Sequence, residues 1–445
     1  MESHHGHALE RLLDRATFGV RPGEIARWRA ENHSPEEWFD AQVGLVDRPD
    51  PELERRLVDA PRSELPRFAP GSSRLKDPSE QRERRRSARR IAEELAGTRI
   101  VRAVHARAQL AEVMTDFWCN HFNIYAVNKS VGALLPHYER EVIARHAMGR
   151  FEDLLLAVAR SPAMLFYLDN WVSTAPVSPG RRRRPRSRGG INENYARELL
   201  ELHTLGVDGG YGQSDVLAVA RVMTGWSLKS RDDPQFAFHA KLHDWGPKNV
   251  LGERVEGRGI EEGEGLLRRL ARHPSTAEHL ARKLAVRFVA DAPPPVLVER
   301  AKTRFLETGG ELSEVLRTVL LSPELSEPSH RKLKTPLRFV ASALRTTDGE
   351  TDGGPRLCQS IAAMGGLPFF ARTPAGHPEC AEDWLDPAAA LERIRLAFML
   401  ARGTVAGTRL GPVLPGFLDR GEGRARLRTH EKFGLALASP EFQWS

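Results

Sequence analysis

The segment from Asn192 to Gly206 reads N-E-N-Y-A-R-E-L-L-E-L-H-T-L-G, and its pattern of apolar and polar residues predicts the fold class. At about 100° per residue, the rotation of an α-helix, its side chains separate into two faces. The apolar face comprises Tyr195, Ala196, Leu199, Leu200 and Leu202, and the polar face comprises Glu193, Asn194, Arg197, Glu198, Glu201 and Thr204. Gly206 follows as a C-terminal cap, because glycine adopts the left-handed conformation at little cost. The segment therefore predicts an amphipathic helix, packed in a mainly α-helical protein.

The polar face of this predicted helix differs in composition from a surface that faces water. It carries three glutamates, one arginine and no lysine, whereas solvated helices usually pair Glu with Lys four residues apart. Glu193, Arg197 and Glu201 form a row of alternating charge at that spacing. We interpret this face as a buried polar network or a functional site, and a solvated face is the alternative. His203 lies in the middle of the apolar face and is interpreted as a hydrogen-bonded core histidine.

The overall composition is that of a globular protein. The 445 residues allow two or three domains or one large helical domain. Hydrophobic residues make up 40% and charged residues 28%, which is enough apolar surface for a core. The net charge of +7 is concentrated in two arginine clusters: Arg82, Arg84, Arg85, Arg86, Arg89 and Arg90, and then Arg181 to Arg184 with Arg186 and Arg188. The basic character is therefore local and says little about the whole protein.

The cysteines and the apolar runs bear on the cellular compartment. The three cysteines are Cys119, Cys358 and Cys380, and no C-x-x-C motif is present. This pattern disfavours a disulfide framework or a zinc ribbon and is typical of a reducing compartment. The N-terminal segment has no apolar core of a signal peptide, and no later run has the length of a membrane span. We expect a cytoplasmic protein that does not bind membranes.

The rest of the chain is mostly helical in pattern. Residues 230–260 are the exception and predict a short hairpin or an ordered loop. The segment 346–355, T-T-D-G-E-T-D-G-G-P, is a linker candidate. We expect a large helical domain over residues 1–345 and a smaller helical part over 356–445, with the possibility that both pack as one domain. A polar stripe of His105, Gln109, Glu112 and Asp116 is interpreted as a surface that faces water.

Three similar segments end helices at Ser-Pro. Residues 153–164 align without gaps to residues 314–325, and residues 435–442 form a shorter third copy. The residue before proline is disfavoured in the α region, so each copy predicts the end of a helix. The copies are too short and too irregularly spaced to predict a solenoid.

Several strings together resemble a bacterial family known only as domain of unknown function number eighteen hundred. They are Leu13 to Gly19 (LDRATFG), Phe117 to Phe122 (FWCNHF), Ser161 to Asn170 (SPAMLFYLDN), Asn192 to Gly206, Met223 to Trp226 (MTGW), His243-Asp244 ahead of Leu251-Gly252, and Lys334 to Pro336. The resemblance covers most of the chain, and the string of fifteen residues at its centre is specific.

The resemblance implies a mostly helical fold and no settled activity. Members of the family often carry export signals and often occur beside sulfatase-like proteins, which implies a possible partner of that kind. This chain departs from the family in having no such signal. It also has Cys119 where the family commonly has histidine, and its segment 365–377 departs from the usual ending of the family pattern.

Our leading functional hypothesis is a metal-dependent enzyme, hydrolytic or oxidative. Carboxylates three residues apart on one helix face are how helical bundles present ligands to a metal. The predicted ligands are Glu198 and Glu201 with His121, His243 and Asp244, and the predicted catalytic residues are Glu193, Arg197 and Glu201. A mixed nitrogen and oxygen site suits zinc, manganese or iron, which would activate water or oxygen. No H-E-x-x-H motif, glycine-rich phosphate loop or G-x-S-x-G elbow is present.

Three other interpretations remain open. The row of Glu193, Arg197 and Glu201 is equally explained as a structural ion-pair network, since buried charges must be paired. The arginine-rich segments would allow binding to an anionic polymer. They lack interleaved aromatic residues and any known base-reading motif, so a nucleic-acid partner is not expected. The third interpretation is a non-catalytic accessory or scaffold protein.

Overall fold

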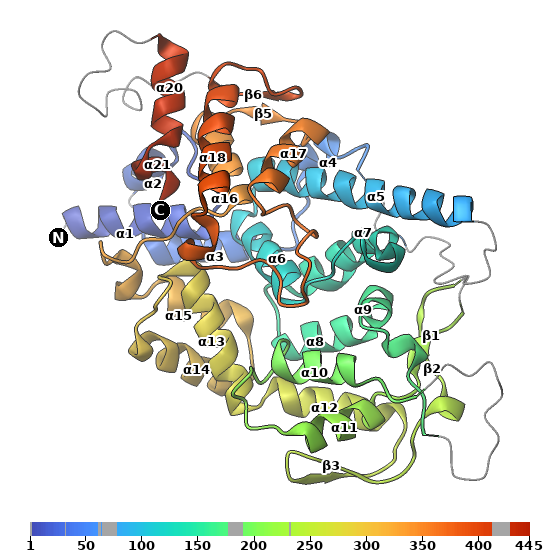
Figure 1. Ribbon diagram of the computed structural model, residues 1–445. Coiled ribbons are helices and arrows are strands. Elements are labelled where there is room, and N and C mark those ends of the chain that lie inside the picture. The colour runs from blue at the N-terminus through green and yellow to red at the C-terminus, as the bar shows by residue number, and fades with distance from the viewer. Residues whose placement is uncertain are drawn as a thin grey trace.

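The protein is described by a computed structural model, and the prediction of a mainly α-helical fold is confirmed (Figure 1). The structure describes residues 2–31, 33–60, 64, 78–176, 190–230, 233–411 and 428–445. The helices of the first half are α1 (Glu2–Ala16), α2 (Glu24–Ala30), α3 (Pro35–Val43), α4 (Pro51–Arg56), α5 (Pro78–His105), α6 (Gln109–His121), η1 (Asn128–Leu134), α7 (Leu135–His137), η2 (Tyr138–Ile143), η3 (Ala144–His146), α8 (Phe151–Arg160), α9 (Pro162–Tyr167), η4 (Asn170–Val172), α10 (Glu193–Glu201) and α11 (Gln213–Val222). Those of the second half are η5 (Ala240–Leu242), α12 (Ile260–Ala271), α13 (Pro274–Phe288), α14 (Pro295–Thr308), α15 (Leu312–Leu320), η6 (Pro323–Ser326), α16 (Pro336–Thr346), α17 (Pro355–Ala363), η7 (Ala381–Trp384), α18 (Pro387–Ala401), α20 (Thr429–Ala438) and α21 (Pro440–Gln443).

Short antiparallel strand pairs interrupt the helices, mainly where the sequence predicts a hairpin. They are β1 (Trp226–Leu228) with β2 (Phe236–Phe238), β3 (Lys248–Val250) with β4 (Glu253–Val255), and β5 (Glu350–Thr351) with β6 (Thr408–Arg409). The last pair places the predicted linker beside a segment almost sixty residues further along the chain. Among the helices of the described ranges, none combines the length and the apolar character that crossing a bilayer requires.

One large hydrophobic core runs through both halves of the chain. It includes Leu9 and Leu13 of α1, Leu199 of α10, Leu357 of α17 and Leu437 of α20. Helix α10 lies between α8, α11 and α12 in the lower part of the molecule (Figure 1). Its apolar side is part of this core, and its polar side is the candidate site described below.

Helix α10 is shorter than the segment from which it was predicted. It spans Glu193–Glu201, and the Asn192 side chain accepts hydrogen bonds from the backbone of Asn194 and Tyr195 at its start. The α-helical pattern stops at Leu202, because the backbone amide of Leu205 bonds to the carbonyl of Leu200, five residues back. Gly206 ends the turn at φ +84°, as its left-handed role predicts.

Because the α-helix ends before residue 204, one residue of the predicted polar face does not lie on that face. Thr204 is fully buried, and its hydroxyl donates to Leu199 O at 2.6 Å. The sequence prediction was wrong for Thr204 because α-helical periodicity does not extend past Leu202. His203 is buried as predicted, with 2% of its surface exposed, but its Nε2 has no hydrogen-bond partner among the described residues, so the predicted hydrogen bond at that atom is absent there.

The polar stripe that was predicted to face water is mostly buried instead. Glu112 is 7% exposed, and one of its carboxylate oxygens lies 2.5 Å from the Arg99 guanidinium of α5. Arg99 also contacts Glu139 of η2 at 3.2 Å, and Glu139 is fully buried. The prediction failed because the arginine that pairs with this stripe lies on a different helix. Glu112 and Glu139 pair with the buried Arg99, in agreement with the rule that a buried charge must be paired.

The three Ser-Pro segments share one geometry. Helices α8, α15 and α20 all end shortly before an extended serine, at Ser161, Ser322 and Ser439. The following proline then opens a new short helix, α9, η6 or α21. Proline suits the first turn of a helix because its missing N–H needs no partner there. The repeated string is therefore a local helix–helix junction.

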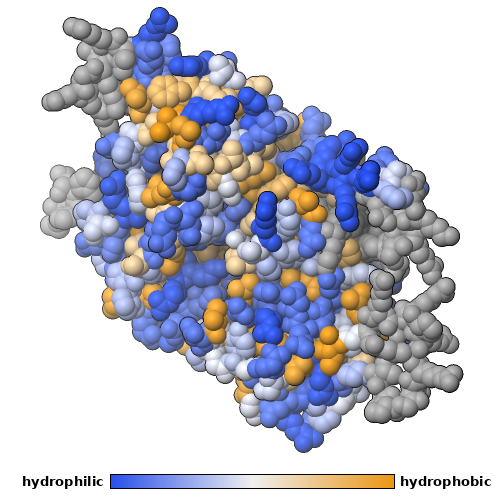
Figure 2. All heavy atoms as spheres, viewed as in Figure 1, coloured by the Kyte–Doolittle hydropathy of each residue, from blue (hydrophilic) through white to orange (hydrophobic). Residues whose placement is uncertain are grey.

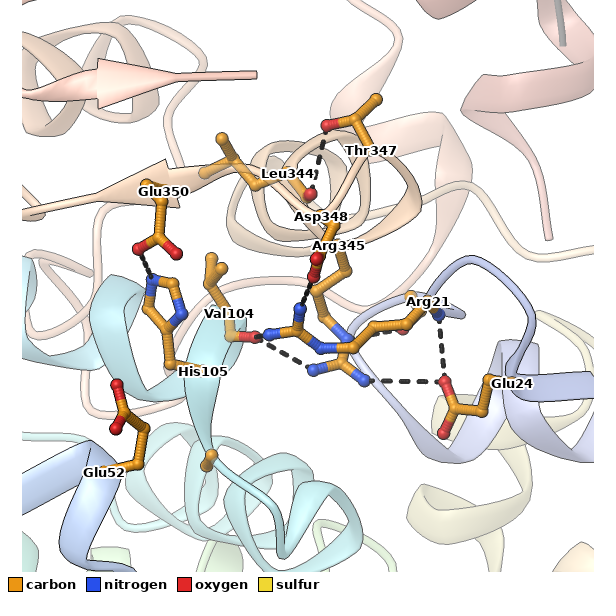
Figure 3. A network of polar contacts seen from close by, with 12 residues as sticks. Arg21, Glu24, Glu52, Val104, His105, Leu344, Arg345, Thr347, Asp348 and Glu350 are labelled. Carbon is orange, nitrogen blue, oxygen red and sulfur yellow. Dashed lines mark hydrogen bonds and ion pairs between the residues drawn. The ribbon is translucent and has the colours of Figure 1, made fainter. Parts of the chain in front are cut away.

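A polar network connects the end of α16 and the residues that follow it to the N-terminal part of the chain (Figure 3). Arg345 donates to the carbonyls of Gly19, at 2.5 Å, and Val104, at 2.9 Å. Arg21 also donates to Val104 O and pairs with Asp348, which lies inside the predicted linker. The network joins the turn after α1, the end of α5 and the end of α16.

Candidate functional site

Three of the strings that carry the family resemblance meet around the start of α10. The Asn192 amide donates to Leu168 O at 2.8 Å, and the backbone N–H of Asn192 donates to the Ser173 hydroxyl at 3.1 Å. Asn170, which is fully buried, donates to the carbonyls of Met223 and Trp226. The asparagines thus join the segment 161–170 to α10 and to the turn before β1. Tyr125, which follows the string Phe117 to Phe122 without belonging to it, hydrogen-bonds through its backbone to the Tyr167 hydroxyl.

Glu198 is the one acidic residue of α10 whose surroundings give it no structural partner. It is partly buried, and within the described part of the chain its carboxyl group has neither a hydrogen bond nor an ion pair. Burial raises the pKa of Glu198, and the like charge of Glu201 raises it further. The Glu198 charge also acts on Tyr167, whose pKa burial raises to about 12. Glu198 is therefore a carboxyl group that holds its proton more firmly than an exposed glutamate.

Glu201 lies one turn further along the same face and has a different environment. The Tyr211 hydroxyl donates to its carboxylate across 3.5 Å, which is a long hydrogen bond. Tyr211 belongs to the glycine-rich segment that connects α10 to α11. The two tyrosines beside the carboxylates were not among the predicted site residues. A tyrosine in a glycine-rich turn was the available signal for Tyr211.

The other two residues of the predicted catalytic set take part in a surface network. Glu193 accepts from the Gln213 amide at 2.8 Å, and Arg197 donates to the same amide group at 3.0 Å. Arg197 and Glu193 are 4.0 Å apart, with 43% and 44% of their side chains exposed. This arrangement agrees with a structural role for Glu193 and Arg197. The row of alternating charge is therefore partly exposed, and Gln213 of α11 connects two of its members.

His121, one predicted metal ligand, lies in a cluster of histidines in which His121 and His203 are buried and His279 is partly buried. Its ring centroid is 6.3 Å from that of His203 and 6.0 Å from that of His279. Its Nε2 donates to His203 O at 3.3 Å. Burial, with the nearby Lys283 charge, lowers the pKa of His121 well below its usual value, so the ring is neutral. A backbone hydrogen bond thus already occupies one of its two ring nitrogens.

His243 and Asp244, the other predicted ligands outside α10, lie in ion pairs. His243 Nε2 is 3.0 Å from Glu262, whose same oxygen is 2.6 Å from Lys248 Nζ. His243 Nδ1 lies 2.8 Å from Thr224 O. Asp244 pairs with Arg221 at 2.7 Å. These contacts attach the irregular segment after β2 to α11 and α12.

The five predicted metal ligands do not form one centre in the structure. No group of three or more His, Cys, Asp or Glu side chains within the described ranges is placed to hold a metal ion. The physical reason is that these side chains already have other partners: His121 donates to His203 O, just after α10, His243 contacts Glu262 of α12, and Asp244 pairs with Arg221 of α11. The structure keeps only the pair on α10, Glu198 and Glu201.

A second polar site, not predicted, lies where α6, α13 and the segment 366–379 meet. A cavity of about 40 Å³ is lined there by Asp116, Cys119, Asn120, Asn123, Arg287, Thr335, Pro336, Leu337, Gly366, Pro368, Phe369, His377, Pro378, Glu379 and Trp384. This volume admits a few water molecules and no larger ligand. Arg287 lies between two carboxylates, 2.8 Å from Asp116 and 3.0 Å from Glu379. It occupies the position in which a cation would bind, so this site is structural.

Comparison with known proteins gives one match. A sequence model of the family described as "Protein of unknown function (DUF1800)" matches residues 11–444. No curated protein and no solved structure matches the chain.

Proposed function

Because the chain belongs to the DUF1800 family, whose description assigns no activity, we propose from the site itself that the protein is a hydrolase with Glu198 and Glu201 as its acid–base pair. The observation that carries the proposal is the environment of Glu198. A partly buried carboxyl group with a raised pKa and no partner stabilises nothing in the fold. Such groups concentrate at catalytic sites.

The two carboxyl groups have the complementary environments that hydrolysis needs. Glu198, with its raised pKa, is the general acid and donates a proton to the leaving group. Glu201 is the general base: it accepts a proton from the attacking water as that water bonds to the substrate and the bond to the leaving group breaks. The Tyr211 hydroxyl orients the Glu201 carboxylate. This mechanism uses water alone and needs none of the three dispersed metal ligands.

The proposal is tested with purified protein and chromogenic p-nitrophenyl esters, glycosides and phosphate diesters. We expect hydrolysis of one class, and a loss of about 100-fold or more in kcat for Glu198→Gln and for Glu201→Gln, as for the removal of a general acid or base. Glu193→Gln is the matched control, because it lies on the same helix and is tied to Gln213. It is expected to keep the wild-type rate.

Two outcomes would overturn the proposal. One is wild-type protein that hydrolyses none of the three classes, and the other is an equal loss of activity in Glu193→Gln. Dialysis against EDTA separates the proposal from the metal-dependent version, because acid–base catalysis is expected to survive it. Activity that is lost on dialysis and restored by zinc, manganese or iron would favour the metal-dependent enzyme that the sequence predicted.

A further inference from the structure

The first turns of helix α5 carry the arginine cluster that the sequence placed at Arg82 to Arg90. At about 100° per residue, Arg82, Arg85, Arg86, Arg89 and Arg90 share an arc of roughly 140°, at the spacing i, i+3, i+4, i+7 and i+8. Only Arg84 points away from this arc. The row is about 12 Å long at 1.5 Å per residue. We call these five residues the arginine row.

The arginine row is exposed and lies at the edge of the molecule. All five residues are exposed, whereas Ala88 and Ala92, on another side of the helix, are buried in the core. The first turns of α5 reach the right edge of the molecule in Figure 1, and hydrophilic residues gather in this region in Figure 2. The helix therefore presents its basic side away from the body.

The charge of the row is only partly neutralised by its neighbours. Arg89 pairs with Glu93 at 2.8 Å and Arg90 with Glu94 at 3.6 Å, each one turn further along the helix. Within the described part of the chain, Arg82, Arg85 and Arg86 have no ion pair. Three guanidinium groups without an ion pair to any described residue thus lie together on two turns of one helix.

We propose that the arginine row binds the phosphate backbone of a double-stranded nucleic acid. Guanidinium groups bind phosphate oxygens in a bidentate manner, which favours arginine over lysine at such a surface. An α-helix is about 10–12 Å across with its side chains, and the major groove is about 12 Å wide. This binding is independent of the hydrolase proposed above.

The observations favour this partner over a membrane or a protein. Helices that bind at a membrane interface carry large apolar side chains beside their basic ones, and hot spots of protein interfaces combine arginine with large aromatic residues. The stretch from Arg82 to Arg90 contains only Glu83, Ser87 and Ala88 besides arginine. The sequence argument against nucleic acid concerned base reading and stacking, and contacts to phosphate need neither.

The test measures binding of the full-length protein to a fluorescein-labelled DNA duplex of 20 base pairs and to an RNA duplex of the same sequence. Fluorescence anisotropy gives the binding constant K at KCl concentrations from 50 to 300 mM. Five phosphate contacts predict that log K falls with log[KCl] with a slope of about −4.5, and the loss of three contacts brings it to about −2. The variant Arg82→Gln/Arg85→Gln/Arg86→Gln is therefore expected to bind more weakly, with the shallower slope.

The matched control removes three exposed arginines elsewhere, as Arg27→Gln/Arg258→Gln/Arg372→Gln. It loses the same formal charge and is expected to keep the wild-type slope. Equal loss in the two triple variants would overturn the proposal, because binding would then follow net charge alone. Absence of binding to both duplexes would also overturn it. The same proteins are also tested with vesicles of phosphatidylcholine and phosphatidylglycerol and with polyglutamate. If these bind through the arginine row and the duplexes do not bind, the proposal is overturned in favour of a membrane or an acidic protein.

Discussion

At the scale of single residues, the buried histidines predict how stability depends on pH. Burial lowers the pKa of His203 to about 3, whereas an unfolded histidine titrates near about 6.5. Between these values the unfolded chain binds the proton and the folded chain does not. The free energy of unfolding therefore falls as the pH falls through this range, by up to about 1.4 kcal/mol per pH unit for this residue. We expect His203→Phe to reduce that dependence.

The measurement is urea denaturation of both proteins at pH 7, 6, 5 and 4. His105 and His279, each with a pKa lowered to about 4 mainly by burial, add to the wild-type slope and remain in the variant. The variant should therefore keep part of the dependence. A slope identical to the wild-type slope would show that His203 is not held neutral in the folded protein.

The same scale shows how much of the candidate site the sequence could predict. Glu198 and Glu201 could be identified, because helix spacing alone places residues three apart on one face. Tyr167 could not be assigned to the site, because it lies on another helix, and no local pattern shows that the Glu198 charge acts on it. His243 has its partners Glu262 and Lys248 on other elements, and no local pattern shows that they meet. The missing information is thus the identity of partners distant along the chain.

At the scale of elements, the start of α10 depends on one asparagine. The Asn192 carboxamide oxygen accepts from the backbone of Asn194 at 2.9 Å, and its nitrogen donates to Leu168 O. Asn192→Ala removes the cap, which typically costs about 1 kcal/mol, and leaves the Leu168 carbonyl without this partner, which adds about 1 kcal/mol or more. We expect the free energy of unfolding to fall by about 2 kcal/mol. Asn194→Ala, at an exposed position of the first turn, is the control and should change it by less than about 0.5 kcal/mol.

Local capping residues account for the starts of two helices at this scale. Ser34-Pro35-Glu36-Glu37 forms a capping box at the start of α3, with Ser34 accepting from the Glu37 backbone. Helix α11 begins at Gln213, where the Asp215 side chain accepts a hydrogen bond from the Gly212 backbone. Local hydrogen bonds determine these starts, so a short stretch of sequence contains the information. The end of α10 differed because a five-residue backbone bond, which leaves no sequence signal, replaces the regular pattern.

At the scale of the whole molecule, long-range contacts connect the two predicted parts of the chain. Asn123 donates to the carbonyls of Ala371 and Thr373, and Asn120 bonds to both backbone groups of His377. The buried Arg15 guanidinium donates to Phe288 O and Ser445 O. Since each residue here bonds to backbone more than a hundred positions away, composition and periodicity could not reveal these connections. They favour the version of the domain prediction in which both parts pack as one.

A truncation at residue 345, the predicted end of the large domain, tests whether the two predicted parts fold as one domain. A fragment of residues 1–345 lacks α17, α18 and α20, whose Leu357, Leu396 and Leu437 are buried in the common core. It also exposes the core face of α16, an element buried over almost its whole length. Because this lost apolar burial exceeds the small net stability of a folded domain, we expect the fragment to show no cooperative thermal transition. Circular dichroism in the near ultraviolet and calorimetry measure this, and co-expression of residues 346–445 should restore the transition. A fragment that melts sharply near the temperature of the full chain would instead establish residues 1–345 as an independent domain.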